Sequence, residues 1–262
     1  MGELGLIEPG RKSAPRTEYI RIVSEPLLEN PRALTEKIAG ALGGTAVERP
    51  GLSGFLSSRF DRFLNQLFAS GNVAPQDAAA AIEGRPGFVW LAEKPDAEEL
   101  GSLRLLEMYG MTATTVVPAE QRPPQGEIAE VRSRDDLDGW FGVYAEVFGA
   151  HLDARDQWAR IHDALGPAGD GSLLLLLARA DGSPAATGAV FFQPDAAGLY
   201  CFTTLERMRR RGLASALVHA CHEAAQARGI EQAVLQATAS ARPAYARAGY
   251  REERPLPVLL SP

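Results

Sequence analysis

The chain has 262 residues, a net charge of −6 and 45% hydrophobic residues, enough apolar content for one large domain or two of ordinary size. The acidic balance argues against bulk binding of nucleic acid or anionic membranes, because proteins that neutralise many phosphates are usually basic. The composition also excludes a largely disordered chain.

The N-terminus and the cysteines predict a cytoplasmic protein. Residues 1–12 lack the charged start and apolar run of a signal peptide, and no apolar stretch approaches membrane-spanning length. Cys201 and Cys221 have no CxxC partner, and we interpret both as buried and reduced. We therefore expect a cytoplasmic monomer or homodimer without membrane or nucleic-acid partners.

The first half of the chain alternates helix and strand signals. A helix is predicted to begin at Asn30 and Pro31, as a cap followed by proline in the first turn, and to end at Gly43. Residues 55–69 fit either a helix or a strand bent by a bulge, and the strand is preferred because of the resemblance given below. The other predicted segments are a helix at 75–82, a strand at 88–91, a helix at 95–109 and a strand at 111–117. This alternation indicates mixed α/β layers.

A polar, proline-rich stretch, PAEQRPPQG, occupies residues 118–126 and indicates a domain boundary. We expect an N-terminal domain at 1–118, a linker at 119–126 and a second domain at 127–262.

The second half begins with a predicted strand at 127–131. Ser133 then caps a helix that ends near Gly149, and another helix covers 154–165. Five consecutive leucines within 172–179 predict a strand buried on both faces. The remaining expected elements are strands at 185–193, 199–204, 233–237 and 251–260, and helices that begin at 213 and 241.

The most informative stretch is residues 199–220, LYCFTTLERMRRRGLASALVHA. An arginine-rich turn joins its strand to the helix that begins at Leu213. Gly212 allows a ligand to approach the main chain, and the helix N-terminus offers free N–H groups. Such a site suits a phosphate or pyrophosphate, although a solvated basic turn is the alternative.

The turn resembles the (Arg/Gln)-x-x-Gly-x-(Gly/Ala) signature of the GNAT superfamily of N-acetyltransferases, through Arg209, Gly212 and Ala214. Downstream, Tyr245 stands where this family carries a helix tyrosine, and Gly249-Tyr250 matches the close of that helix. The first half looks like the N-terminal copy of a tandem acetyltransferase that has lost its cofactor turn, since no arginine-glycine turn opens a helix in residues 1–118. An unrelated accessory domain is the alternative.

The resemblance implies an α/β (α+β) GNAT fold, with a central mixed, mostly antiparallel sheet flanked by helices and a second GNAT-like domain at the N-terminus. It also implies acetyl-coenzyme A as co-substrate and no metal. The co-substrate is expected between the strand that ends at Thr204 and the strand at 234–237, which must separate to admit it. The residues expected to bind it are Phe202, Thr203, Thr204, Arg209, Arg210, Arg211, Gly212, Leu213, Ala214 and Ser215.

The resemblance assigns Tyr245 as the general acid that protonates the leaving thiolate, and a tyrosine packed in the core is the alternative. Many relatives carry a glutamate base on the cofactor strand, but Gly198 stands at that position and cannot act. No base is named. In this family the corresponding helices line the acceptor site, which makes His151, Asp153, Trp158 and His162 substrate-side candidates; each is alternatively a core or exposed residue.

We therefore expect an acetyl-CoA-dependent N-acetyltransferase, in which the primary amine of a small molecule attacks directly. The acceptor would be an amino acid derivative or an aminated antibiotic or metabolite. Two alternatives stay open: acetylation of protein N-termini or lysines, and a coenzyme A-binding module without catalysis.

Overall fold

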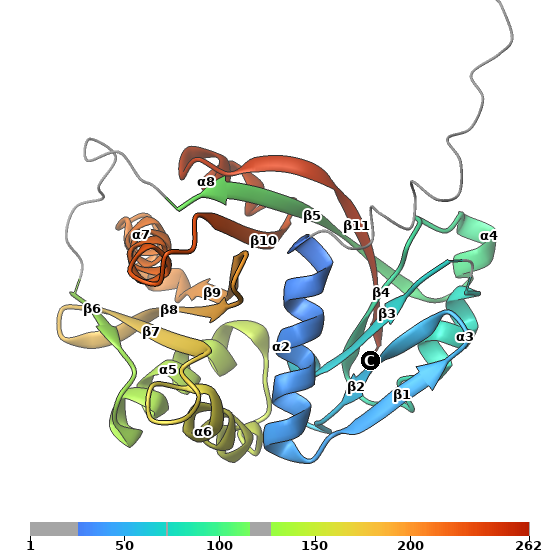
Figure 1. Ribbon diagram of the computed structural model, residues 1–262, viewed down its shortest axis with the longest axis horizontal. Coiled ribbons are helices and arrows are strands. Elements are labelled where there is room, and N and C mark those ends of the chain that lie inside the picture. Colours follow the sequence, from blue (N-terminus) through green and yellow to red (C-terminus); the bar gives the residue numbers. More distant parts are fainter. Residues whose placement is uncertain (1–25, 72, 116–126, 262) are drawn as a thin grey trace, which may run out of the picture.

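A computed structural model describes residues 26–71, 73–115 and 127–261, which share one mixed β-sheet (Figure 1). The sheet has 11 strands in the order β1-β2-β3-β4-β11-β5-β10-β9-β8-β7-β6. The strands are β1 Thr45–Arg49, β2 Leu52–Leu56, β3 Asn65–Ala69, β4 Gly87–Trp90, β5 Arg104–Thr114, β6 Glu127–Glu130, β7 Leu173–Ala180, β8 Ser183–Phe192, β9 Ala197–Thr204, β10 Gln232–Thr238 and β11 Arg251–Ser261. The helices are α2 Pro26–Leu42, α3 Pro75–Ala80, α4 Ala97–Leu100, α5 Arg134–Phe148, α6 Ala154–Leu165, α7 Leu213–Gln226 and α8 Arg242–Arg247, with 3-10 turns η1 Arg62–Leu64 and η3 Glu206–Met208. No helix within the described residues is long and apolar enough to cross a membrane.

The two halves of the chain exchange their last strands. β5 belongs to the first half but pairs with β10, and β11 belongs to the second half but pairs with β4. These long strands also pair with each other, and they curve across both halves (Figure 1). The exchange makes one continuous sheet across the predicted boundary, while residues 119–126, the predicted linker, lie outside the described residues.

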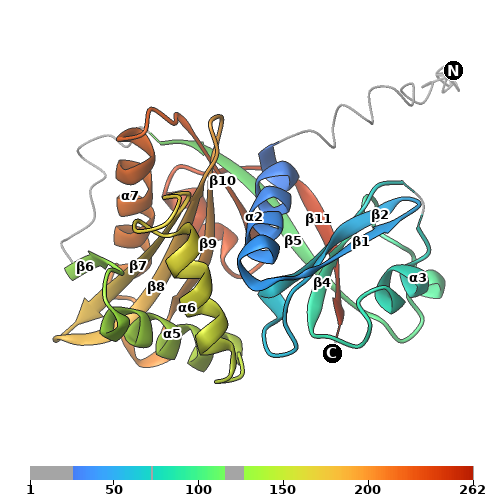
Figure 2. The same cartoon turned by 60° about the horizontal axis from the view of Figure 1, so that its bottom comes forward.

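Helices cover both faces of the sheet in the second half (Figure 2). Leu173, Leu175 and Leu177 of β7 pack with α5 and α6, whereas the intervening Leu174 and Leu176 pack with α7. The alternation follows from the two-residue period of a strand, and it confirms the prediction of a strand buried on both faces.

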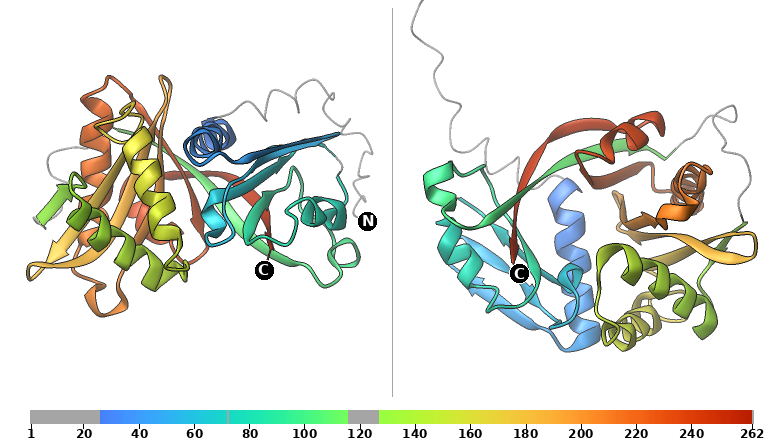
Figure 3. Two further views of the ribbon diagram at one scale, coloured as in Figure 1. Left: turned by 90° about the horizontal axis from the view of Figure 1, so that it is seen from below. Right: turned by 180° about the vertical axis from the view of Figure 1, so that it is seen from behind.

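Helix α2 lies between the two halves (Figure 3). It contacts β2 and β3 on one side and α6, β9 and β10 on the other. The predicted start at Asn30 was wrong, because the helix already includes Pro26 and both Asn30 and Pro31 lie inside it. Asn30 is fully buried and serves the contact with the second half rather than capping the helix.

Two other predictions in the first half were wrong. The expected helix at 95–109 is helical only at Ala97–Leu100, because the segment from Arg104 onward is the strand β5, paired on both edges. The bent strand expected at 55–69 is two strands separated by a loop and η1, since Asn65 accepts hydrogen bonds from the N–H groups of Ser57 and Ser58 and holds that loop. The strand expected at 111–117 is the last part of β5, and residues 116 and 117 lie outside the described residues. The other predicted elements are confirmed within one to a few residues.

Candidate active site

Strands β9 and β10 pair for only three residues and then separate. The parallel ladder joins Ala197, Gly198 and Leu199 of β9 to β10, and β10 continues beside β5. From Tyr200 onward, the edge of β9 that faces β10 is therefore free of a strand partner, while its other edge stays paired with β8. A free strand edge presents peptide groups that an extended ligand with amide groups can match.

The turn before α7 is shaped for an anion. Arg210 and Gly212 both adopt left-handed backbone conformations, with φ of 67° and 79°. Such turns direct backbone N–H groups into a concave anion site. Gly212 is also the N-cap of α7 and provides no side-chain cap, which leaves the first N–H groups of the helix available to a ligand.

The separated strands and the turn open into one cleft of about 680 Å³, here named the β9–β10 cleft. Nine of the ten residues predicted to bind the co-substrate line it: Phe202, Thr203, Thr204, Arg209, Arg210, Gly212, Leu213, Ala214 and Ser215. The exception is Arg211, whose guanidinium pairs with Asp181 at 2.8 Å outside the cleft. The sequence reasoning missed Arg247, Met208, Val218, Ser240, Ala241, Ala244 and Ala248, which also line the cleft but share no motif.

Charge in the cleft has one sign. Among the described residues that line it, the charged ones are Arg209, Arg210 and Arg247. Several guanidinium groups beside free helix N–H groups favour a ligand with more than one negative charge.

Tyr245 lies on α8 and lines the same cleft. Its half-buried ring makes edge contacts with Phe202, at 6.3 Å, and with Tyr250, at 5.8 Å, measured between ring centroids. Its hydroxyl has no hydrogen-bond partner among the described residues. Burial, and to a smaller degree Cys221, raises the pKa of this phenol, so that it carries its proton at neutral pH.

A bulge in β9 lies where the strand leaves β10. The β8–β9 register shifts between Thr187 and Ala189, and Cys201 has a φ of 56°. The Thr187 hydroxyl donates a hydrogen bond of 2.8 Å to the Cys201 carbonyl and holds this conformation. Because of the bulge, Tyr200 and Cys201 both face α5 and α6, while Phe202 faces α7 and the cleft.

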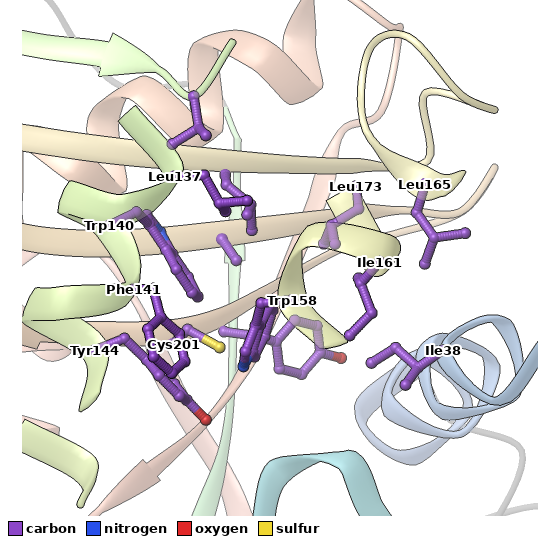
Figure 4. Packing of buried hydrophobic residues seen from close by; sticks show 14 of the residues in the cluster. Ile38, Leu137, Trp140, Phe141, Tyr144, Trp158, Ile161, Leu165, Leu173 and Cys201 are labelled. Atoms are coloured by element: carbon purple, nitrogen blue, oxygen red, sulfur yellow. The ribbon is translucent and has the colours of Figure 1, made fainter. Parts of the chain in front are cut away.

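A second cavity, of about 180 Å³, lies on the opposite face of β9 and is here named the Asp61 pocket. Its lining includes Phe60, Asp61, Arg62, Tyr144, Phe148 and Cys201. Cys201 points toward the aromatic side chains of α5 and α6 (Figure 4). The two cavities thus flank the strand at the bulge, with Cys201 lining one and Phe202 the other.

Asp61 is 3% exposed and its carboxylate accepts three hydrogen bonds. The donors are the Trp158 indole at 2.8 Å, the Tyr144 hydroxyl at 3.0 Å and the Phe63 N–H at 2.9 Å. Burial raises the pKa of Asp61, and these hydrogen bonds together with the charge of Arg62 oppose the rise. Sequence reasoning missed Asp61, since one aspartate in a segment expected to be strand carries no motif.

The four substrate-side candidates do not form one cluster, although His151 and Asp153 contact each other, with 3.4 Å between the His151 Nδ1 atom and the Asp153 carboxylate. Trp158 is 1% exposed and positions Asp61, and the His162 ring lies 2.9 Å from the Val131 carbonyl. His151 stacks on Phe60 at the rim of the Asp61 pocket, and its neighbour Asp153 is exposed. Across the described ranges, no group of three or more His, Cys, Asp or Glu side chains is placed to hold a metal ion.

Comparison with known proteins gives three kinds of match. Residues 142–256 match the family model described as an acetyltransferase (GNAT) domain. A protein named mycothiol acetyltransferase, from Clavibacter michiganensis, is 29% identical over 66% of this chain, and the match spans 61% of the length of that relative. A GCN5-related N-acetyltransferase from Kribbella flavida aligns over 88% of this chain and 95% of its own, with a TM-score of 0.59 and 20% identity. A GCN5-related N-acetyltransferase-like protein from Streptococcus suis aligns over 94% and 100%, with a TM-score of 0.60 and 14% identity.

Proposed function

Because this chain carries an acetyltransferase domain of the GNAT family and has the GNAT fold, we propose that it transfers an acetyl group from acetyl-coenzyme A to the primary amine of a small molecule. The observation that supports this most is the pair of cavities that flank β9 at its bulge. One is long and positively charged, and the other is small and holds a buried carboxylate.

The β9–β10 cleft suits coenzyme A along its length. The N–H groups of the turn and of the first turn of α7 would hold the pyrophosphate, with Arg209 and Arg210 adding charge. The free edge of β9 from Phe202 to Thr204 would pair with the pantetheine amides. The thioester would then reach the bulge at Cys201, where the acceptor can meet it.

The residues of the cleft supply two parts of the chemistry. Backbone N–H groups at the bulge would stabilise the oxyanion that forms when the amine attacks. Tyr245, protonated at neutral pH, would donate its proton to the departing thiolate.

Two observations favour a small acceptor. The Asp61 pocket, at about 180 Å³, is smaller than typical sites for drug-sized ligands, which span roughly 300–1,000 Å³. Residues of the first half, including Phe60 and Asp61, close it on one side. The name of the relative from Clavibacter michiganensis also points to a small molecule as the acceptor of that protein.

We propose further that residues 1–118 are a degenerate copy of the domain at 127–262. In the first half, β1, β2 and β3 are antiparallel, and α3 leads to β4, which is parallel to β3. In the second half, β7, β8 and β9 are antiparallel, and α7 leads to β10, which is parallel to β9. The recurrence of this order supports a tandem origin. The buried, unpaired thiols of Cys201 and Cys221 fit a reducing, cytoplasmic location.

The experiment is a thiol-release assay with acetyl-coenzyme A and a panel of acceptors. Small primary amines should release thiol, whereas peptides with a free N-terminus or a lysine should not. Release with peptides alone would indicate a protein acetyltransferase. Tight binding of acetyl-coenzyme A without release for any amine would indicate a non-catalytic module.

A further inference from the structure

The Asp61 carboxylate is a buried charge with no cation bound to it. Its three hydrogen-bond donors are the neutral groups of Trp158, Tyr144 and Phe63. The Arg62 guanidinium, although it lines the same pocket, donates to the Ser261 carbonyl at 3.1 Å. Among the described residues no ion pair reaches Asp61. A buried carboxylate in this state favours a cationic ligand, because the ligand would supply the missing opposite charge.

Among the described side chains that surround the Asp61 carboxylate, none competes with it as a proton acceptor. Tyr144 on α5 and Cys201 on β9 both have pKa values raised by burial and by the neighbouring carboxylate, and so both stay neutral. Helix α6 contributes the indole of Trp158, which does not titrate, and η1 contributes the guanidinium of Arg62, which is a hydrogen-bond donor and not an acceptor. A raised pKa brings Asp61 closer to the range in which a carboxylate can exchange protons near neutral pH.

The mouth of the pocket is apolar and aromatic. Phe60 is 40% exposed and Phe148 is 52% exposed, which is unusual for large hydrophobic residues. The ring of His151 stacks on Phe60 with 5.6 Å between ring centroids. Exposed aromatic side chains at the mouth of a cavity indicate a ligand with an apolar body. The few polar groups inside such a cavity fix the orientation of the ligand.

On these grounds, and resting on the proposed acetyltransferase function, we propose that the Asp61 pocket binds the acceptor as a primary ammonium ion with an apolar body. The ammonium group would bind the Asp61 carboxylate and give it one proton. The freed lone pair would form the new C–N bond with the thioester carbon across the bulge as the C–S bond breaks. The proton lost from the attacking nitrogen would return to Tyr245, which had protonated the thiolate.

This assignment gives the first half of the chain a catalytic contribution. Gly198, on the cofactor strand β9, has no side chain that could act as a base. Asp61 lines the same pocket as Cys201 of β9, although it precedes Cys201 by 140 residues in the chain. Its hydrogen bonds to Tyr144 and Trp158 anchor it to α5 and α6. The base would thus come from the copy that has lost its own cofactor turn.

The first test uses 2-phenylethylamine as acceptor and compares the wild-type protein with Asp61→Asn, which keeps the shape and an acceptor oxygen. In the wild type, kcat/KM should stay level through neutral pH. In the variant it should fall about 100-fold at neutral pH and rise steadily toward alkaline pH, as the free amine loses its proton in solution. Unchanged affinity for acetyl-coenzyme A, measured by calorimetry, would show that the variant is folded. A wild-type pH profile in the variant would overturn the proposal.

The second test works even if Asp61→Asn fails to fold. Phe148→Lys places a cation at the mouth and should raise KM for 2-phenylethylamine about tenfold through charge repulsion, with little change in kcat. Leu152→Lys is the matched control, since Leu152 is 75% exposed and lies outside the pocket lining. Equal KM values in these variants and the wild type would contradict the proposal. The neutral analogue 2-phenylethanol should not compete with the amine.

Different results would overturn the Asp61 assignment and the proposed acetyltransferase function. Acetylation of strongly polar amines or peptides, but not of 2-phenylethylamine, would overturn the Asp61 assignment and leave the acetyltransferase function standing. Absence of both acetyl-coenzyme A binding and thiol release would overturn the proposed function itself, and the assignment with it.

Discussion

The side-chain amide of Asn30 fills the space beside Gly198. A Cβ atom built on Gly198 would lie 1.8 Å from the Asn30 Oδ1 atom. The Tyr200 hydroxyl donates to this oxygen at 2.6 Å, and the Asn30 amide donates to the Ala196 carbonyl at 3.1 Å. Helix α2 therefore fills the space that a side chain at position 198 would need. A side chain at Gly198 and the present docking of α2 exclude each other.

This relationship predicts that Gly198→Ala lowers the free energy of unfolding by about 1–3 kcal/mol, because the added methyl group overpacks a filled space. Asn30→Ala should also destabilise the protein, since it removes two buried hydrogen bonds. The double variant should lose less than the sum of the single variants, because the smaller side chain makes room for the methyl group.

Urea unfolding measures these changes. Gly40→Ala is a matched control within α2, where an added Cβ meets nothing within 4 Å and should be neutral or stabilising by up to about 1 kcal/mol. Wild-type stability in Gly198→Ala would show that α2 does not pack on β9 as described.

Gly212→Glu should weaken acetyl-coenzyme A binding by about 100-fold or more, because it puts bulk and negative charge where the pyrophosphate would lie. Gly229→Glu is a matched control beyond the other end of α7. Its φ of 73° is close to the 79° of Gly212, so that both variants carry similar backbone strain. Calorimetry should show normal affinity in the control, and equal affinities in both variants would reject the phosphate assignment.

Tyr245→Phe should lower kcat by about 100-fold and leave the affinity for acetyl-coenzyme A nearly unchanged, because the phenol acts only when the thiolate departs. Tyr250→Phe is the control, since Tyr250 packs on Tyr245 but does not line the cleft. It should alter stability rather than turnover. If Tyr245→Phe turned over at the wild-type rate, the tyrosine would be a packing residue.

His222 should make the protein sensitive to acid. Its ring is 1% exposed, its Nε2 atom lies 2.8 Å from the Tyr250 hydroxyl, and burial, with a smaller contribution from His219, lowers its pKa to about 4. The unfolded chain binds a proton near pH 6.5 and the folded chain does not, so the unfolded state binds more protons between pH 6.5 and 4. Stability should therefore fall as the pH falls through this window.

The lost stability should reach about 3 kcal/mol from this one group. Thermal unfolding of the wild type and of His222→Gln, compared at pH 7 and pH 4, isolates the contribution, because the glutamine does not titrate. The difference in stability between the two proteins should shrink at pH 4. If the stability difference between the two proteins were the same at pH 7 and pH 4, His222 would have the same pKa in the folded and unfolded states.

The cofactor side of the site could be predicted because its parts are close in the sequence. Nine of the ten residues that were predicted to bind the co-substrate line the cleft, and all nine lie in the strand, turn and helix from Leu199 to Ala220. Local rules for turns and helix ends apply to this stretch. Arg247 lines the same cleft from α8 and was missed, because its position depends on how α8 packs against β10.

The acceptor side could not be predicted, because it depends on contacts between distant segments. Asp61 meets Trp158 across 97 residues and Tyr144 across 83. The same cause explains the error at residues 104–109, which were predicted to be helical and form the first part of β5. Its edges are satisfied by β10 and β11, which lie more than 100 residues later in the chain.

The first half has a cavity between the end of β3, the start of α3 and the end of β4, which is where the proposed tandem origin would place a counterpart of the β9–β10 cleft. It has a volume of about 420 Å³. Its lining includes Glu93 and Glu99, which repel phosphate, and Pro75, which lacks an N–H group at the start of α3. Lys94 also lines it, but its ammonium group pairs with Glu107 at 2.9 Å. We therefore expect it not to bind coenzyme A.

The most direct test of the central claim is calorimetric titration of the full-length chain with acetyl-coenzyme A, in which the number of sites is measured together with the affinity. One site per chain with micromolar affinity is expected, and Gly212→Glu should abolish this binding. Two sites would show that the first half keeps a working cofactor site. No binding would contradict the assignment of the β9–β10 cleft and leave the arginine turn without a ligand.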